Sequence, residues 1–204
     1  MMIKICGLFR EDDVQFVNEA FPDYAGFVFA ESRRKVSPEQ AKALRAALIP
    51  DIIPVGVFRD ADADAIAGLY SDGIIDVAQL HGGEGPELVD SLKEQGITTI
   101  KTVSVSGAED VRNACGCGAD YVMFDNGSGG TGERFDWSLL SHANGKFFLA
   151  GGIDAGNIGD AAATGAYAAD VSSGAETGGV KDRDKIRTLV MAAHSQGSYK
   201  GGIS

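Results

Sequence analysis

The sequence predicts an α/β protein, a single (β/α)8 barrel of near-minimal length built from strand–helix units. Eight short apolar runs, many rich in β-branched residues, alternate with stretches that have helical features. Most runs are apolar almost without interruption, which is typical of parallel strands covered by helices. Eight units in 204 residues leave about 25 residues for each, close to the minimum for a strand, a helix and two short loops. An open doubly wound sheet would alternate in the same way, but the number of units favours the closed barrel.

The elements follow one another without a linker or a low-complexity segment. The predicted strands are 3–6, 24–29, 52–58, 74–80, 98–103, 121–124, 146–150 and 168–173. The predicted helices are 37–48, which begins with Ser37 as N-cap and Pro38 in the first turn, then 61–73, 84–96, 107–118, 154–165 and 180–197. Several of them end at a glycine, a common helix stop. We therefore expect one domain over 1–204, with 197–204 as a flexible tail.

Composition and charge exclude several classes of function. The formal net charge of −11 argues against nucleic-acid binding, which requires a basic surface. No apolar stretch approaches the roughly 20 residues of a membrane span. Lys4 interrupts the first apolar run and charged residues follow it, so a signal peptide is not expected and the predicted location is cytoplasmic. Three cysteines, two of them in a C-x-C pair at Cys115 and Cys117, indicate neither a disulfide framework nor a zinc site.

Polar and reactive residue types collect at the ends of the predicted strands. In a (β/α)8 barrel the active site is built at the C-terminal ends of the strands. The residues found there are Cys6 and Gly7, Arg33 and Arg34, His81, Asp125, Gly151 and Gly152, and Ser172, Ser173 and Gly174. A chain with only a structural role has no need of this arrangement.

Strand periodicity predicts which of these side chains share a face. Because side chains alternate along a strand, a Cys6 that points into the barrel mouth places Lys4 inside the barrel one layer below. A buried lysine requires a partner, and Asp170 is the candidate, as a structural pair. By the same periodicity Gln79 and His81 share a face, as do Met123 and Asp125, and Asp170 and Ser172.

The turns after the seventh and eighth strands predict a phosphate site. Gly151 and Gly152 follow one strand, and Ser172, Ser173 and Gly174 follow its neighbour. Backbone N–H groups at such turns bind anions, and barrels often bind phosphate in this position. The alternative is that these are tight turns that merely need glycine. The segment GSGGTG, which includes Gly130, is expected to add an N–H contact or to close over the ligand; it is not a P-loop.

Cys6 and Asp125 form a candidate acid/base pair. They follow the first and sixth strands and are expected to face each other across a small ligand, so that a thiolate takes a proton and a carboxylic acid gives one. Asp125 could instead serve as an N-cap or bind its own loop. His81 at a strand end is expected to contact substrate or cap the loop rather than act as a base. No His/Asp/Glu cluster has metal-ligand spacing, so no metal is expected.

Taken in order, the motifs resemble those of a known family. KICG, FVF, SRR-x-VSP, PVGVF, QLHG, FD followed by GGTG and FDW, GG with a later Asn157, and DVSSG all occur. Over nearly the whole chain they resemble phosphoribosylanthranilate isomerase of tryptophan biosynthesis, a TIM-barrel family. Ala150, before the GG pair, stands where family members often have serine.

The resemblance implies a cofactor-free Amadori rearrangement of a phosphorylated aminosugar. Position by position it implies Cys6 as general base, Asp125 as general acid and Arg34 as the residue that holds the anthranilate carboxylate, bidentately. The phosphate would lie on Gly151, Gly152, Ser172, Ser173 and Gly174. Because a free thiol has a pKa of about 8.5, a base role requires positive potential near Cys6, from Lys4 or from the helix that follows.

Three other readings are open. A related isomerase of the histidine and tryptophan pathways would use two aspartates, and a cysteine at position 6 argues against it. Indole-3-glycerol phosphate synthase would need a lysine and a glutamate at strand ends, and Lys101 is the only lysine so placed. A barrel that has lost catalysis would bind a phosphate ligand without turnover. For the oligomeric state, the sequence allows a monomer or a homodimer.

Overall fold

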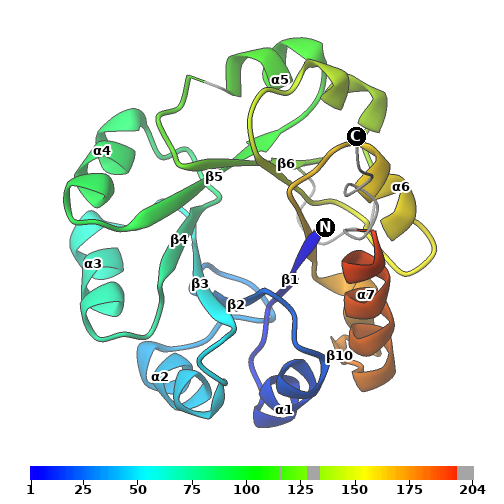
Figure 1. Cartoon of the computed structure of the whole chain (residues 1–204). Helices are drawn as coiled ribbons and strands as arrows, with labels where there is room; N and C mark the ends of the chain where they lie inside the picture. The colour runs from blue at the N-terminus through cyan, green and yellow to red at the C-terminus, as the bar shows by residue number, and fades with distance from the viewer. Residues whose placement is uncertain (115, 128–133, 197–204) are drawn as a thin grey trace, which may run out of the picture.

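The computed structural model describes residues 1–114, 116–127 and 134–196. Its eight parallel strands close into a barrel in the order of the sequence, with helices packed around the outside (Figure 1). The strands are β1 (Met2–Cys6), β2 (Tyr24–Val28), β3 (Ile53–Phe58), β4 (Val77–Leu80), β5 (Thr98–Ser104), β6 (Tyr121–Asp125), β7 (Phe147–Leu149) and β8 (Ala168–Val171). The predicted (β/α)8 barrel is confirmed.

The α-helices lie on the outside of the ring, and those before α7 connect successive strands. They are α1 (Glu11–Ala20), α2 (Pro38–Ala47), α3 (Ala63–Ser71), α4 (Pro86–Glu94), α5 (Ala108–Ala114), α6 (Ile158–Ala163) and α7 (Arg183–Ser195). As predicted, Ser37 caps α2, because its side chain accepts a hydrogen bond from the N–H of Gln40. Between β6 and β7 the described residues form a 3-10 helix, η1 (Trp137–His142), in place of an α-helix.

The chain after β8 differs from the prediction. The eighth strand ends at Val171 rather than at residue 173, because Ser173 begins a 3-10 turn, η2 (Ser173–Ala175). A two-stranded antiparallel hairpin follows, β9 (Glu176–Thr177) and β10 (Val180–Lys181). The last helix therefore starts at Arg183, where the Asp182 side chain accepts hydrogen bonds from two N–H groups of the first turn. The predicted tail over 197–204 lies outside the described residues.

The barrel closes between its first and last strands. β1 pairs with β8 in a parallel register that sets Lys4 opposite Asp170. The N-terminal ammonium of Met1 donates a hydrogen bond to the carbonyl oxygen of Ala193 in α7, at 3.1 Å. Inside the ring, the lower layers are filled by apolar and aromatic side chains, Tyr24, Val55, Val77, Ile100, Met123 and Phe148 among them. The interior is thus a packed core, and only its upper end is open to a ligand.

A larger apolar layer lies between the strands and the helices that surround them. It includes Ile3, Ile5, Phe27, Leu80 and Phe124, all of which are buried. Alternate residues of each strand therefore point outward into this layer or inward to the barrel axis. In the part of the chain that the structure describes, no helix has both the length and the apolar character needed to cross a membrane.

Candidate active site

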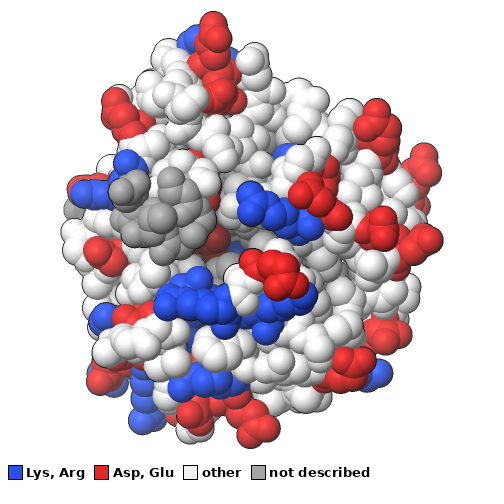
Figure 2. All heavy atoms as spheres, turned by 180° about the vertical axis from the view of Figure 1, so that it is seen from behind, with Lys and Arg blue, Asp and Glu red and all other residues white. Residues whose placement is uncertain are grey.

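A cavity of about 470 Å³ opens at the C-terminal ends of the strands. The predicted site residues that line it are Cys6, Arg34, His81, Asp125, Gly151, Gly152, Ser172 and Ser173, and Arg59, Gln79 and Asp170 join them. Figure 2 shows lysine and arginine side chains gathered around the centre of one face, with acidic side chains mostly toward its edge. Although the chain is strongly acidic overall, two arginines, Arg34 and Arg59, line the cavity.

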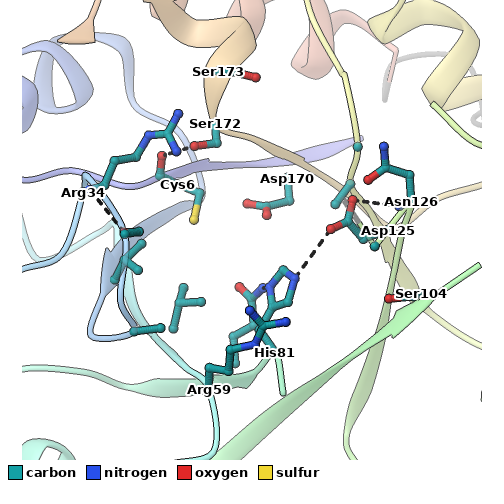
Figure 3. Close-up of a pocket in the computed structure, with 18 of the residues that line it drawn as sticks. Cys6, Arg34, Arg59, His81, Ser104, Asp125, Asn126, Asp170, Ser172 and Ser173 are labelled. Carbon is teal, nitrogen blue, oxygen red and sulfur yellow. Dashed lines mark hydrogen bonds and ion pairs between the residues drawn. The ribbon is translucent and has the colours of Figure 1, made fainter. Parts of the chain in front are cut away.

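Cys6 and Asp125 lie on opposite sides of this cavity, with the Asp170 carboxylate between them in the view of Figure 3. Cys6 is the last residue of β1 and Asp125 the last residue of β6, and both are largely buried. The structure therefore brings together the thiol and the carboxyl group that the sequence predicted to share a site.

Lys4 lies beneath the thiol, as the strand periodicity predicted. Its ammonium is completely buried and donates hydrogen bonds to Gln79 Oε1 and Asp170 Oδ1, both at 2.8 Å. Burial alone would lower the pKa of Lys4, but the Asp170 and Cys6 side chains outweigh it and raise this pKa above its usual value. The predicted pair of Lys4 with Asp170 is therefore present, and Lys4 is held as an ammonium.

Burial has the largest effect on the pKa of the Cys6 thiol. Burial raises the pKa of Cys6 above the ordinary range of a thiol, although the positive charges of Lys4 and Lys181 act in the opposite direction. The expected positive potential from Lys4 is present, but burial outweighs it and the pKa of Cys6 is raised. A raised pKa keeps Cys6 as a thiol at neutral pH.

Asp125 is bound by its own loop and faces His81. Its Oδ1 accepts a hydrogen bond from the N–H of Asn126 at 2.8 Å, and its Oδ2 lies 3.5 Å from His81 Nε2. On the other side of the imidazole, Gln79 Nε2 lies 3.4 Å from His81 Nδ1. His81 therefore links the carboxyl group to the polar layer that also holds Lys4, a position that its place at a strand end did not reveal.

The turns after β7 and β8 approach each other closely. Gly151 and Gly152 have φ values of 91° and 63°, which L-residues rarely adopt. A Cβ atom on Gly174 would lie 2.0 Å from the carbonyl oxygen of Ile153, so only glycine allows the two turns to meet. Asn157, which the family motif includes, donates to the Gly152 carbonyl at 2.8 Å and fixes the first turn.

Two of the predicted phosphate contacts need qualification. The Ser172 hydroxyl donates a hydrogen bond to the Cys6 carbonyl oxygen at 3.2 Å, so this proton is already committed (Figure 3). Gly130 lies outside the described residues. The remaining groups at these turns are mainly backbone N–H groups, which suit an anion.

Sequence reasoning missed Glu176 and Lys181, which lie behind the site in the β9–β10 hairpin. Glu176 is buried, and its carboxylate accepts hydrogen bonds from Arg34 Nε at 2.6 Å and Arg34 Nη2 at 2.9 Å. Lys181 Nζ donates to Glu176 Oε1 at 2.8 Å and to the Ser172 carbonyl at 2.9 Å. The bidentate edge of Arg34, expected to hold a substrate carboxylate, therefore binds Glu176.

Lys101 and a metal-binding cluster are the two remaining features that bear on the function. Lys101 donates to the Gly82 carbonyl at 2.8 Å and to Glu84 at 2.7 Å, and it is not among the residues that line the cavity, which removes the support for a lyase. Within the described ranges, histidine, cysteine, aspartate and glutamate side chains nowhere gather in a group that could hold a metal ion.

The fold and the position of the cavity define the class. The chain is a TIM-barrel protein whose site is built on the loops at the C-terminal ends of its strands, as in the enzymes of this fold. A family model described as N-(5'-phosphoribosyl)anthranilate isomerase matches residues 3–192. An enzyme of that name from Endomicrobium trichonymphae is 46% identical over 199 residues, which cover 95% of this chain and 98% of the relative.

Solved structures of the same family are similar to this chain. The phosphoribosyl anthranilate isomerase of Thermus thermophilus superposes with a TM-score of 0.86 at 33% identity, covering 96% of this chain and 99% of that one. A second isomerase structure, in complex with reduced 1-(o-carboxyphenylamino)-1-deoxyribulose 5-phosphate, has a TM-score of 0.84 at 32% identity, with coverages of 96% and 99%. The chain belongs to the N-(5'-phosphoribosyl)anthranilate isomerase family and is an isomerase of tryptophan biosynthesis.

Proposed function

We propose that this cavity catalyses the Amadori rearrangement of N-(5'-phosphoribosyl)anthranilate to 1-(2-carboxyphenylamino)-1-deoxyribulose 5-phosphate, with Asp125 as general acid and Cys6 as general base. The observation that carries this assignment is that a thiol and a carboxyl group from opposite parts of the ring line one cavity beside two glycine-containing turns. General acid–base catalysis requires both groups within reach of one bound molecule.

The rearrangement moves one proton through each group. Asp125 gives a proton to the ring oxygen, the C1'–O bond breaks, and the nitrogen lone pair forms a protonated Schiff base. Cys6 thiolate then removes the proton from C2', and the electron pair forms an enolamine. The enol proton is lost and C1' gains one, which yields the ketone. These steps leave Asp125 without its proton and Cys6 with one more, so Cys6 must release a proton and Asp125 must take one up before the next turnover.

Cys6 must lose its proton before it can act as the base. Burial raises the pKa of Cys6, so this deprotonation needs support from nearby positive charge. The ammonium of Lys4 below Cys6 and that of Lys181 stabilise the thiolate. Both lysines are positioning residues, since neither is among the residues that line the cavity.

The substrate phosphate is assigned to the turns after β7 and β8. Gly151, Gly152 and Ser173 line the cavity beside these turns, and Gly174 lines an adjoining pocket, so their backbone N–H groups are the candidates to bind a phosphate. The reduced product analogue bound to the related isomerase is itself a sugar phosphate, which supports a phosphorylated small-molecule substrate. We assign the anthranilate carboxylate to Arg34, through the Nη1 side of a guanidinium that Glu176 holds by its other edge.

A fluorescence assay tests the assignment. The protein is mixed with phosphoribosylanthranilate generated in situ, and loss of anthranilate-type fluorescence is followed. Cys6→Ala and Asp125→Ala should each lower kcat by at least about 100-fold, the usual contribution of a general acid or base. Cys117→Ala removes a second free thiol that does not line the cavity and should keep full activity.

The same assay separates the alternatives. A barrel without catalysis would bind the reduced product analogue and leave substrate fluorescence unchanged. An isomerase with two substrates would also convert the histidine-pathway aminoaldose. If both site variants retain most of the activity, the roles of Cys6 and Asp125 are wrong even though the family is right.

Three broader expectations belong to this proposal. We assign residues 1–204 to a single domain, a cytoplasmic location, and a monomeric or homodimeric state. Limited proteolysis, cell fractionation and sedimentation equilibrium test them in turn.

A further inference from the structure

Arg59 is a cavity residue that no motif of the family resemblance contains. It directly follows PVGVF, at the end of β3, and it lines the active-site cavity. In Figure 3 its side chain lies on the side of the cavity away from Ser172 and Ser173, near His81. Because β3 lies across the ring from β7 and β8, Arg59 faces the end of the cavity opposite the phosphate turns.

The backbone after Arg59 is locked in place. Asp60 has a φ of 52°, a left-handed conformation that is uncommon for a residue other than glycine. Its N–H donates to Glu84 Oε1, and its carboxylate accepts from the N–H of Gly83, both at 2.8 Å. Lys101 in turn holds Glu84 at 2.7 Å. These bonds from the next loop over-determine the turn and set the direction in which Arg59 leaves β3.

The two cavity arginines differ in what they bind. Arg34 donates two hydrogen bonds to the Glu176 carboxylate. The guanidinium of Arg59 is exposed and, among the described residues, makes neither a hydrogen bond nor an ion pair. Its full set of donors and its charge are thus available to a ligand.

The cavity that holds the two arginines also has an apolar wall. Val28 and Val57 are paired across β2 and β3, and both line the cavity, together with Ala30. An aromatic ring packs well on such a surface, and a carboxylate on that ring would then lie between two guanidinium groups.

We propose that Arg59 binds the carboxylate of the substrate's aromatic end, and that it selects for aminosugars carrying an ortho-carboxylated ring. The inference rests on the proposed function, because that function places the phosphate at the far turns and the aromatic acid at this end. Arg59 is a second cation at the aromatic end, beside the partly neutralised Arg34.

Binding of two ligands that differ by one group tests the inference. The first is reduced 1-(o-carboxyphenylamino)-1-deoxyribulose 5-phosphate, and the second is the same compound with an unsubstituted phenyl ring. Calorimetry on Arg59→Gln should show about tenfold weaker binding of the first ligand, the usual effect of losing one charge-assisted contact. Binding of the phenyl compound should stay within about twofold of wild type, and Arg59→Lys should recover part of the loss.

The controls separate a local contact from a change in overall charge. Arg112→Gln removes the same charge from an exposed position on α5 and should leave both affinities unchanged. Equal weakening of both ligands by Arg59→Gln would overturn the inference, as would no weakening of either. Selective loss on Arg34→Gln alone would assign the carboxylate to Arg34 only. Turnover of phosphoribosylanthranilate by the wild-type protein tests the proposed function independently of all these outcomes.

Discussion

Cys6 shows why the identity of a residue does not fix its protonation state. A cysteine at the end of the first strand was predicted to be the base, with a cation beneath it to stabilise the thiolate. The cation is present, but Lys4 is shared with Asp170 and Gln79, and desolvation of the sulfur is the larger effect. The sequence alone does not reveal this balance between desolvation and positive charge, because it depends on the burial of the sulfur and on the other partners of the lysine.

The pH dependence of kcat/KM follows from the protonation of Cys6. The active enzyme holds one proton between Cys6 and Asp125, and loss of that proton inactivates it. Since burial raises the pKa of the thiol above 9.0, activity should persist through neutral and mildly alkaline pH and fall only above about pH 9. A rate profile measures this, and thiolate absorbance of the protein against Cys6→Ser locates the pKa directly. An alkaline limb below pH 8 would contradict the assignment.

At the level of elements, the hairpin β9–β10 is the feature that sequence patterns did not reveal. Strands of two residues carry no periodicity, and the charges of Glu176 and Lys181 are typical of a solvated loop. Both residues are nevertheless buried, because the hairpin folds back over the end of β8 and pairs with Arg34 from the loop after β2. Arg59 was missed for a similar reason: an arginine after a strand usually faces water.

Removing the Glu176 charge should destabilise the fold and weaken substrate binding. Arg34 and Lys181 lower the pKa of Glu176 below its ordinary 4.5, against the opposing effect of burial. The ionised carboxylate therefore stabilises the folded state above that pH, and the stabilisation is lost as the pH falls through the depressed value. Glu176→Gln should lower the free energy of unfolding by about 3 kcal/mol at pH 7, measured by urea denaturation, and should raise KM.

The contrast with an exposed pair provides the control. Glu19 binds Arg183 on the surface, where both side chains are largely exposed, so Glu19→Gln should change the free energy of unfolding little. The difference in the free energy of unfolding between Glu176→Gln and the wild type should become smaller below pH 4.5. If both substitutions have the same small effect, Glu176 does not hold the hairpin to the site.

On the scale of the whole molecule, the barrel and most of its strand ends were predictable. Apolar runs repeat eight times, several of the helices between them end at a glycine, and a closed ring brings all the carboxyl ends of the strands to one face. Cys6, Asp125 and the glycine turns therefore met as expected. The contacts that could not be predicted are tertiary. The partner of each charged side chain depends on contacts between loops, such as the one between Asp60 and Glu84, and no local sequence pattern encodes these contacts.

The buried pair that joins the first and last strands should matter for stability. Lys4→Met leaves Asp170 without its cation inside the barrel and should cost about 3–5 kcal/mol in the free energy of unfolding. Replacing both residues, as in Lys4→Met/Asp170→Leu, should restore much of that loss, since no charge is then left unpaired. Urea denaturation measures both variants, with the exposed Lys42→Met as a reference. A loss below about 1 kcal/mol for Lys4→Met alone would show that the pair is not needed.

The pairing of β1 with β8, together with the bond from the Met1 ammonium to α7, brings the two ends of the described chain side by side. A ring of this kind has no structural first unit, because each strand has two neighbours. A chain broken in a connection remote from the cavity, with residues 1 and 196 linked instead, would leave every strand with both of its partners.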